Sequence, residues 1–296
     1  MSDLEQTAIE RLKAASDMIL RLFEKPLVIT YSGGKDSDVL LHLAEASGIP
    51  FEVLHSLTTA DAPQTVYHVR DTFHRLEDKG IKCTVDKHVQ PDGSRITMWN
   101  LIPRKLMPPT RVVRYCCAVL KEGGGKDRFI ATGVRWDESA ARKKNRGALE
   151  VITSKKENKL ILSNDNSEDR RLFESCQLKG KRVVNPIVDW KTDDVLDYIE
   201  SEHIQMNPLY GCGFSRVGCI GCPMAGKRDR DLEFTMFPKF KASYIRAFDR
   251  MILERERRGK MENGMRWGHN GVDVFHWWMD DGVIPGQEVL DGFEEI

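Results

Sequence analysis

Short apolar runs alternate with longer amphipathic stretches in the first half of the chain. Apolar positions between residues 4 and 24 recur at close to 3.6-residue intervals, which predicts an amphipathic helix. Four short apolar runs have the length of buried strands: 27–31, 51–55, 82–86 and 129–133. Helical stretches at 38–46 and 64–76 separate the first three runs. This alternation predicts an α/β fold, with a parallel sheet covered by helices on both faces.

The pattern changes in the second half of the chain. Beyond about residue 165 it becomes helical, most clearly at 192–203 and 239–258. We therefore expect an α/β domain over residues 1–165 and a smaller, mostly helical region over residues 166–296. Aromatic residues near the C-terminus predict a helix packing stripe, with a base-stacking platform as the alternative: Trp267, Phe275, Trp277 and Trp278.

Composition narrows the class of protein. Hydrophobic residues make up 41% and charged residues 30%, as in ordinary globular proteins. No apolar run approaches 18 residues, and the first 20 residues lack the core of a signal peptide, so we expect a cytoplasmic protein. Seven cysteines in such a protein favour metal or cofactor ligation over disulfides.

The formal net charge of zero hides an uneven distribution. The segment from Arg104 to Arg146 contains twelve Lys or Arg and four acidic residues. After Arg266 there are seven acidic residues and no Lys or Arg. This distribution favours a localised anion site, and a solvated charged face is the alternative.

One polar hexapeptide lies between the first predicted strand and its following helix: Ser32-Gly33-Gly34-Lys35-Asp36-Ser37. Glycines allow a tight turn whose backbone N–H groups face an anion, and the positive end of the helix points to the same place. The serines can donate hydroxyl groups, Lys35 can neutralise charge, and Asp36 can position a metal ion or the loop itself. The Walker pattern GxxxxGK[ST] is absent.

The hexapeptide resembles the SGGKDS pyrophosphate loop of the PAPS reductase family and of the N-type ATP pyrophosphatases. The resemblance implies a Rossmann-like, adenine nucleotide alpha-hydrolase-like sheet that binds ATP with Mg²⁺, or PAPS or APS. Lys35 and Asp36 then act in catalysis, and all six residues of the loop bind the nucleotide.

Three further segments extend the resemblance over about residues 27–224. Residues 132–139 resemble the TGxRxxES signature, which implies nucleotide contacts from Gly133, Arg135 and Glu138 and a catalytic role for Arg135. The alternative is a solvated loop in which Arg135 pairs with Glu138. Residues 56–65 resemble the adenine-contacting segment, which includes Thr58. Residues 185–195 match a segment to which we assign a structural role.

The cysteines form a CC…CxxC pattern of Cys116, Cys117, Cys219 and Cys222. Four thiolates can bind zinc or a [4Fe–4S] cluster, and glycines beside the second pair leave room for inorganic sulfide. Spacing alone does not choose between the metals. The pattern resembles that of assimilatory APS reductases, which implies a [4Fe–4S] cluster on these four cysteines, with its charge offset by Arg114, Lys121 and Arg216.

The chain departs from the reductases at one point. They attack the sulfonucleotide with a cysteine in a C-terminal Glu-Cys-Gly motif, and no cysteine follows Cys222 here. Cys212 and Cys176 could serve as redox or sulfur-carrying thiols or be inert. The chain is most similar to PAPS-reductase-like proteins of bacteria and phages, and to the ATP pyrophosphatase subunits of DNA phosphorothioation systems.

Three functions follow as hypotheses. The first is an ATP pyrophosphatase that adenylates a substrate for sulfur transfer, in nucleic-acid modification with a cysteine desulfurase or other sulfur-transfer partner. The second is a PAPS or APS reductase that uses an atypical thiol. The third is a non-catalytic nucleotide-binding redox sensor or complex subunit. Basic stretches at 142–146, 155–159 and 179–182 could approach a DNA or RNA backbone, although such stretches are often merely solvated.

Overall fold

The computed structural model describes residues 2–121, 128–152, 160–162, 181–260 and 267–280. Cys176 and the basic stretch 155–159 lie outside the described residues. The helices are α1 (Asp3–Phe23), α2 (Lys35–Ser47), α3 (Pro63–Glu77), α4 (Met98–Lys105), α5 (Tyr115–Leu120), α6 (Ala140–Asn145), α8 (Thr192–Ser201), α9 (Lys227–Met236), α10 (Pro238–Arg257) and α11 (Gly271–Met279). The 3₁₀ segments are η1 (Trp136–Glu138) and η3 (Pro208–Cys212). The strands are β1 (Leu27–Thr30), β2 (Phe51–Ser56), β3 (Cys83–Asp86), β4 (Phe129–Ala131), β5 (Leu149–Ile152), β6 (Leu160–Leu162) and β7 (Lys181–Val184).

The described strands form one mostly parallel sheet. Its order is β3-β2-β1-β4-β7-β5-β6. The first five strands in this order are mutually parallel, whereas β5 is antiparallel to both β7 and β6. The α/β fold with a Rossmann-like sheet is thus confirmed. In such a sheet ligands bind beyond the carboxyl ends of the parallel strands, which is where β1 leads into α2.

Alternating side chains of β1 separate two apolar clusters. Leu27 and Ile29 belong to the main core, together with residues of α1, α2, α3 and α8. Val28 points the other way, as strand geometry requires, and joins a small cluster with Ile130 and Val183. The predicted N-terminal helix is present as α1, where a capping box links Ser2 and Glu5.

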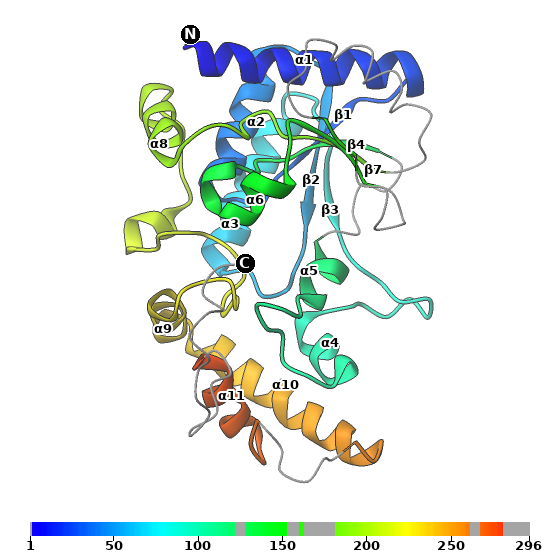
Figure 1. Cartoon of the computed structure of the whole chain (residues 1–296), viewed down its shortest axis with the longest axis vertical. Coiled ribbons are helices and arrows are strands. Elements are labelled where there is room, and N and C mark those ends of the chain that lie inside the picture. Colours follow the sequence, from blue (N-terminus) through cyan, green and yellow to red (C-terminus); the bar gives the residue numbers. More distant parts are fainter. Residues whose placement is uncertain (1, 122–127, 153–159, 163–180, 261–266, 281–296) are drawn as a thin grey trace.

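A second core lies beyond the carboxyl ends of the strands. Figure 1 shows α4, α9, α10 and α11 gathered there, on the opposite side of the sheet from α1. Their buried side chains form one aromatic-rich cluster that also includes residues of the cysteine-bearing loop, Cys219 and Ile220. Phe275 and Trp278 are buried in this cluster, and Trp267 and Trp277 pack against it, as the packing-stripe interpretation predicts.

Several elements were not expected from the pattern. The strand β7 lies within the part of the chain expected to be helical, and it pairs with β4 in the sheet. Its four residues are too few to show a clear period in the sequence. The helices α4 and α5 were also not predicted. Helix α5 has only six residues, and α4 contains Pro103, a residue type that usually interrupts a helix. The division of the chain near residue 165 stays a prediction.

Candidate nucleotide and cysteine site

The predicted phosphate loop is tied together by its own side chains. The Ser37 hydroxyl donates to the Gly34 carbonyl at 2.7 Å and accepts from the Gly34 N–H at 3.1 Å. Gly33 has a φ of +75°, and a Cβ there would lie 3.0 Å from Cγ2 of Val69. Glycine therefore supplies both the left-handed backbone and the space that the turn needs. Ser32 is exposed, so its hydroxyl can reach a ligand.

The second predicted signature packs directly against the first turn of α2. Arg135 donates from Nε to Oδ1 of Asp36 at 2.7 Å, and Nζ of Lys35 lies 3.8 Å from Oδ2 of the same carboxylate. A Cβ on Gly133 would lie 2.8 Å from the carbonyl oxygen of Asp36, so only glycine permits this approach. Loops that are 99 positions apart in the sequence thus meet at one carboxylate.

The Arg135 side chain is only 2% exposed, which contradicts the solvated-loop alternative. Its other donors reach the carbonyl of Trp190 at 3.4 Å and the hydroxyl of Thr192 at 3.3 Å. Glu138 pairs instead with Arg142. Partial burial raises the pKa of Glu138, and the charge of Arg142 offsets this in part. Arg135 is therefore placed to hold Asp36 in position.

The loop after β2 connects the nucleotide segment to the cysteines. Thr58 is buried, and its hydroxyl accepts from the Ala60 N–H at 3.2 Å and from the Cys219 thiol at 3.4 Å. The Ile220 N–H donates to the Ala60 carbonyl at 2.7 Å. Next to this bond, the backbones of Asp61 and Cys219 form an isolated antiparallel β-bridge. The CxxC loop is thereby fixed to the segment that was expected to contact adenine.

The four predicted cysteines influence one another electrostatically. A hydrogen bond to Cys117 raises the pKa of Cys116, with further contributions from burial and from Cys219 and Cys222. Burial raises the pKa of Cys219 to about 11, and the nearby charge of Lys121 opposes this rise. The fold therefore brings together two cysteine pairs about a hundred positions apart.

Lys121, an exposed residue directly after α5, interacts electrostatically with these thiols. Its pKa is raised, chiefly by Cys219 and further by Asp61, Cys222 and Cys117. Among the described residues, no three His, Cys, Asp or Glu side chains are arranged as metal ligands. The chemistry of these donors nevertheless fits a thiolate-bound cluster, because the four thiols interact electrostatically with one another and with a cation that would offset their negative charge.

The turn of the CxxC loop is supported from α9. The buried carboxylate of Glu233 accepts the Gly221 N–H at 2.6 Å. Burial raises the pKa of Glu233 to about 7. A Cβ on Gly221 would lie 2.4 Å from Cζ of Phe234 and 2.9 Å from the Trp278 ring. Aromatic rings therefore fill the space beside Gly221, so this glycine does not leave the expected room for sulfide, whereas a Cβ on Gly218 would meet only the Arg216 side chain, at 3.4 Å.

Two residues at this site were missed in the sequence. The amide of Asn207 donates to the Gly33 carbonyl at 2.9 Å and to the Thr65 hydroxyl at 3.1 Å. The hydroxyl of Tyr210 accepts the Lys35 N–H at 3.0 Å. The only signal in the sequence was the Asn-Pro pair, which marks a turn but not its partner. Cys212, two residues further on, is exposed.

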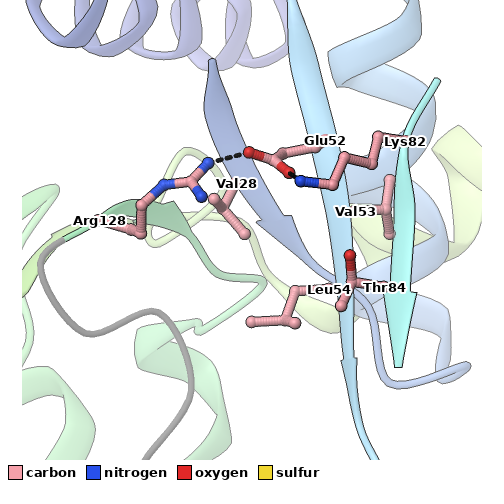
Figure 2. A pocket seen from close by; sticks show the side chains of 7 residues that line it. All are labelled: Val28, Glu52, Val53, Leu54, Lys82, Thr84 and Arg128. Carbon is pink, nitrogen blue, oxygen red and sulfur yellow. Dashed lines mark hydrogen bonds and ion pairs between the residues drawn. The ribbon is translucent and has the colours of Figure 1, made fainter. Parts of the chain in front are cut away.

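A cavity of about 240 Å³ lies away from this site, on the sheet surface around β1, β2 and β3. Figure 2 shows the Glu52 carboxylate between Arg128 and Lys82 at this cavity. Burial raises the pKa of Glu52, but these two cations outweigh it and lower the pKa overall. The lining includes no residue of the phosphate loop or of the cysteine set, so the cavity is separate from the candidate site.

A mostly parallel sheet that ends in a glycine loop at a helix N-terminus defines a nucleotide-binding α/β protein. Residues 26–225 match the sequence profile of the phosphoadenosine phosphosulfate reductase domain. The chain belongs to this family, and the predicted family is thus confirmed.

Several known proteins are similar to this chain. Sulfate adenylyltransferase subunit 2 of Hahella chejuensis is 30% identical over 220 residues, which cover 71% of this chain and 69% of that protein. Among solved structures, the phosphoadenylyl-sulfate reductase of Candida auris is 15% identical, with a TM-score of 0.42, over 74% of this chain and 96% of that one. The U34-tRNA thiolase NcsA of Methanococcus maripaludis, solved with its [4Fe–4S] cluster, is 16% identical, with a TM-score of 0.42, over 90% and 87%.

Within the described part of the chain, no helix combines the length and the apolar character that crossing a membrane requires.

Proposed function

We propose that this chain is an ATP pyrophosphatase that adenylates a substrate oxygen so that sulfur can replace it. The observation that carries the proposal is the direct bonding of the CxxC loop to the loop after β2, through Ile220 with Ala60 and Cys219 with Thr58. A phosphate-binding loop and a set of four thiols thereby share one end of the sheet. Activation by a nucleotide and transfer of sulfur both need groups of these two kinds.

On the nucleotide side, the loop 32–37 and the N-terminus of α2 would hold the β- and γ-phosphates of Mg²⁺-bound ATP. The substrate oxygen attacks the α-phosphorus and forms a new P–O bond. The bond between the α-phosphorus and its bridging oxygen breaks, and pyrophosphate leaves with the electron pair along the glycine loop. Lys35 stabilises the charge that develops on the leaving group.

In this scheme Arg135 acts through Asp36. Its guanidinium is enclosed and bonded to that carboxylate, which leaves Asp36 as the group that meets Mg²⁺ or the loop. Asp36 remains 24% exposed, so it is accessible to a ligand. Gly133 permits the close contact between the two loops, and Glu138 with Arg142 borders it.

On the sulfur side, Cys116, Cys117, Cys219 and Cys222 would hold a [4Fe–4S] cluster. When bound, such a cluster supplies a site that can bind sulfur or transfer an electron. Lys121 stabilises the negative charge of the thiolates. Thr58 accepts a hydrogen bond from the Cys219 thiol, and Glu233 accepts one from the backbone N–H of Gly221.

The acceptor that we propose is a nucleic acid, as in DNA phosphorothioation, and the proposed sulfur source is a cysteine desulfurase or a similar persulfide donor. The basic composition of residues 104–146 supports an anionic acceptor. The proposal of a cytoplasmic location fits a thiol-rich site that requires reducing conditions.

The test is an anaerobic assay for pyrophosphate with ATP and Mg²⁺, with and without nucleic acid. We expect release by the wild-type protein and none by Asp36→Ala. Asp71→Ala, on the exposed face of α3, is the matched control and should retain activity. Tight ATP binding without turnover under all conditions would instead favour the nucleotide-binding sensor.

Reduction of PAPS or APS is the second candidate. It is favoured by the exposure of Cys212, which lies two residues from the tyrosine that contacts the phosphate loop. Sulfite release from PAPS or APS with a thiol reductant, lost in Cys212→Ser, would establish this activity and overturn the first proposal. Cys176→Ser should be assayed in the same way, because Cys176 is the other candidate thiol for this reaction.

A further inference from the structure

Tyr210 brings a phenol to the anion-binding end of α2 from a distant part of the sequence. Its hydroxyl accepts the backbone N–H of Lys35, the first residue of the helix, at 3.0 Å. A Cβ on Gly34 would lie 3.5 Å from this oxygen. The Lys35 ammonium lies 5.7 Å from the centre of the Tyr210 ring. The phenol therefore borders the space that a phosphate on this loop would occupy.

The bonding of this hydroxyl leaves its proton available. A phenol has one O–H donor and can accept two hydrogen bonds. Besides Lys35, the backbone of Val217 hydrogen-bonds to the same oxygen, and both contacts lower the pKa, as donors do. Backbone groups thus approach the oxygen as donors, and among the hydrogen bonds of the described residues none is donated by the Tyr210 O–H.

The hydroxyl also keeps its proton at neutral pH. Burial raises the pKa of Tyr210 to about 12, in spite of the two backbone donors. Two N–H groups that donate to the oxygen polarise the O–H bond and make it a stronger donor. A protonated, oriented hydroxyl beside a lysine and a helix N-terminus is suited to an anion.

We propose that Tyr210 is a phosphate-binding residue that donates its hydroxyl proton to a phosphate oxygen of the bound nucleotide. The inference rests on the proposed function, because it requires a nucleotide on the loop 32–37. It extends the site to a residue supplied by η3. The Lys35 ammonium and this phenol are then two of the donors to the phosphate.

This placement gives the cysteine-bearing segment a direct part in nucleotide binding. The hydroxyl of Tyr210 contacts Val217, which lies two residues before Cys219. Asn207 fixes the start of the same segment to Gly33. The orientation of the phenol is therefore set by the loop that carries the second cysteine pair.

The test compares wild type, Tyr210→Phe and Tyr67→Phe by calorimetric titration with ATP, inorganic pyrophosphate and adenosine. A hydrogen bond to a charged group contributes about 1.5–3 kcal/mol, so Tyr210→Phe should bind ATP and pyrophosphate roughly 10- to 100-fold more weakly. Adenosine lacks phosphate, so the affinity of Tyr210→Phe for adenosine should stay within about twofold of the wild-type affinity. Tyr67, which is 54% exposed on α3, provides the control and should change nothing.

Two results would overturn the inference. One is wild-type affinity of Tyr210→Phe for pyrophosphate. The other is an equal loss of affinity for adenosine and pyrophosphate, which would mean that the phenol only supports the loop. If the wild-type protein binds none of the three probes, the proposed nucleotide site itself is wrong, and the inference fails with it.

Discussion

The phosphate loop (residues 32–37) and the CxxC loop (Cys219–Cys222) are both tight turns that carry candidate site residues. They are stabilised in different ways. The turn of the phosphate loop is closed by its own members, since Ser37 bonds Gly34 in both directions, and distant residues such as Asn207 and Tyr210 add further bonds to it. The CxxC loop depends on partners elsewhere: Thr58 bonds Cys219, Ala60 bonds Ile220, and Glu233 bonds the intervening Gly221.

This difference predicts which amino-acid substitutions each region should tolerate. A loop closed by neighbouring residues keeps its shape when distant parts of the chain change. A loop held by distant partners depends on the packing of both cores, because its buried residues belong to the aromatic cluster of α9, α10 and α11. The predictions below test whether the two regions can be separated.

The largest effect is expected from Cys219→Ser. Replacing this thiol removes one of the four proposed ligands, so iron and sulfide content and the visible absorbance of the reconstituted protein should be lost. ATP affinity should stay within about threefold of wild type, since the bonds of the phosphate loop with Tyr210 and Asn207 do not involve the Cys219 thiol. Cys83→Ser, on the edge strand β3, should leave the cluster intact. Loss of ATP binding in Cys219→Ser would contradict the independence of the two regions.

Arg135→Met should destabilise the contact between the first and second signatures. Only Arg135 is fully enclosed, since Asp36 is 24% exposed and keeps Lys35 nearby, so the loss should cost about 2–3 kcal/mol, at or below the range for a fully buried pair. Arg142→Met removes an exposed partner of Glu138 and should cost less than about 1 kcal/mol. Unfolding by denaturant measures both values. Equal costs would show that the enclosure of Arg135 adds nothing to stability.

Gly133→Ala should have a smaller effect on the same contact. The added Cβ would lie 2.8 Å from the backbone oxygen of Asp36, so the loop must shift, at a cost of about 2 kcal/mol. Gly211→Ala is the matched control, because a Cβ there meets nothing within 4 Å. Thermal unfolding and ATP titration should both separate the variants. A neutral Gly133→Ala would mean that the two loops are free to move apart.

The smallest effect concerns Glu233 and pH. Its pKa in the folded protein is raised to about 7 by burial, above the ordinary value of 4.5. The folded state therefore favours the protonated carboxyl, and the stability that this contributes is lost as pH rises from about 5 through 7. The Tm of wild type relative to Glu233→Gln should fall by about 2–4 °C between pH 5 and pH 6, or about 1 kcal/mol. A constant difference would place the carboxyl at an ordinary pKa.

Much of the fold could be predicted because its signals are local. The run 27–31 contains the strand β1, the run 51–55 covers all of β2 except its last residue, and the helix between them begins at the predicted loop. The strand β7 was missed because its assignment depends on pairing with β4 rather than on its own period. The segment 185–195 was correctly taken as structural, with Trp190 and Val195 buried.

The sequence by itself determined the chemistry of the site. Six consecutive residues specify the phosphate loop, because a tight turn before a helix needs only its own glycines and hydroxyls. Only the tertiary structure decided which distant groups meet them. Tyr210 lies 175 positions from Lys35, and Arg135 lies 99 positions from Asp36. Such pairs leave no local trace in the chain, since their contact arises from the packing of two cores at the ends of the strands.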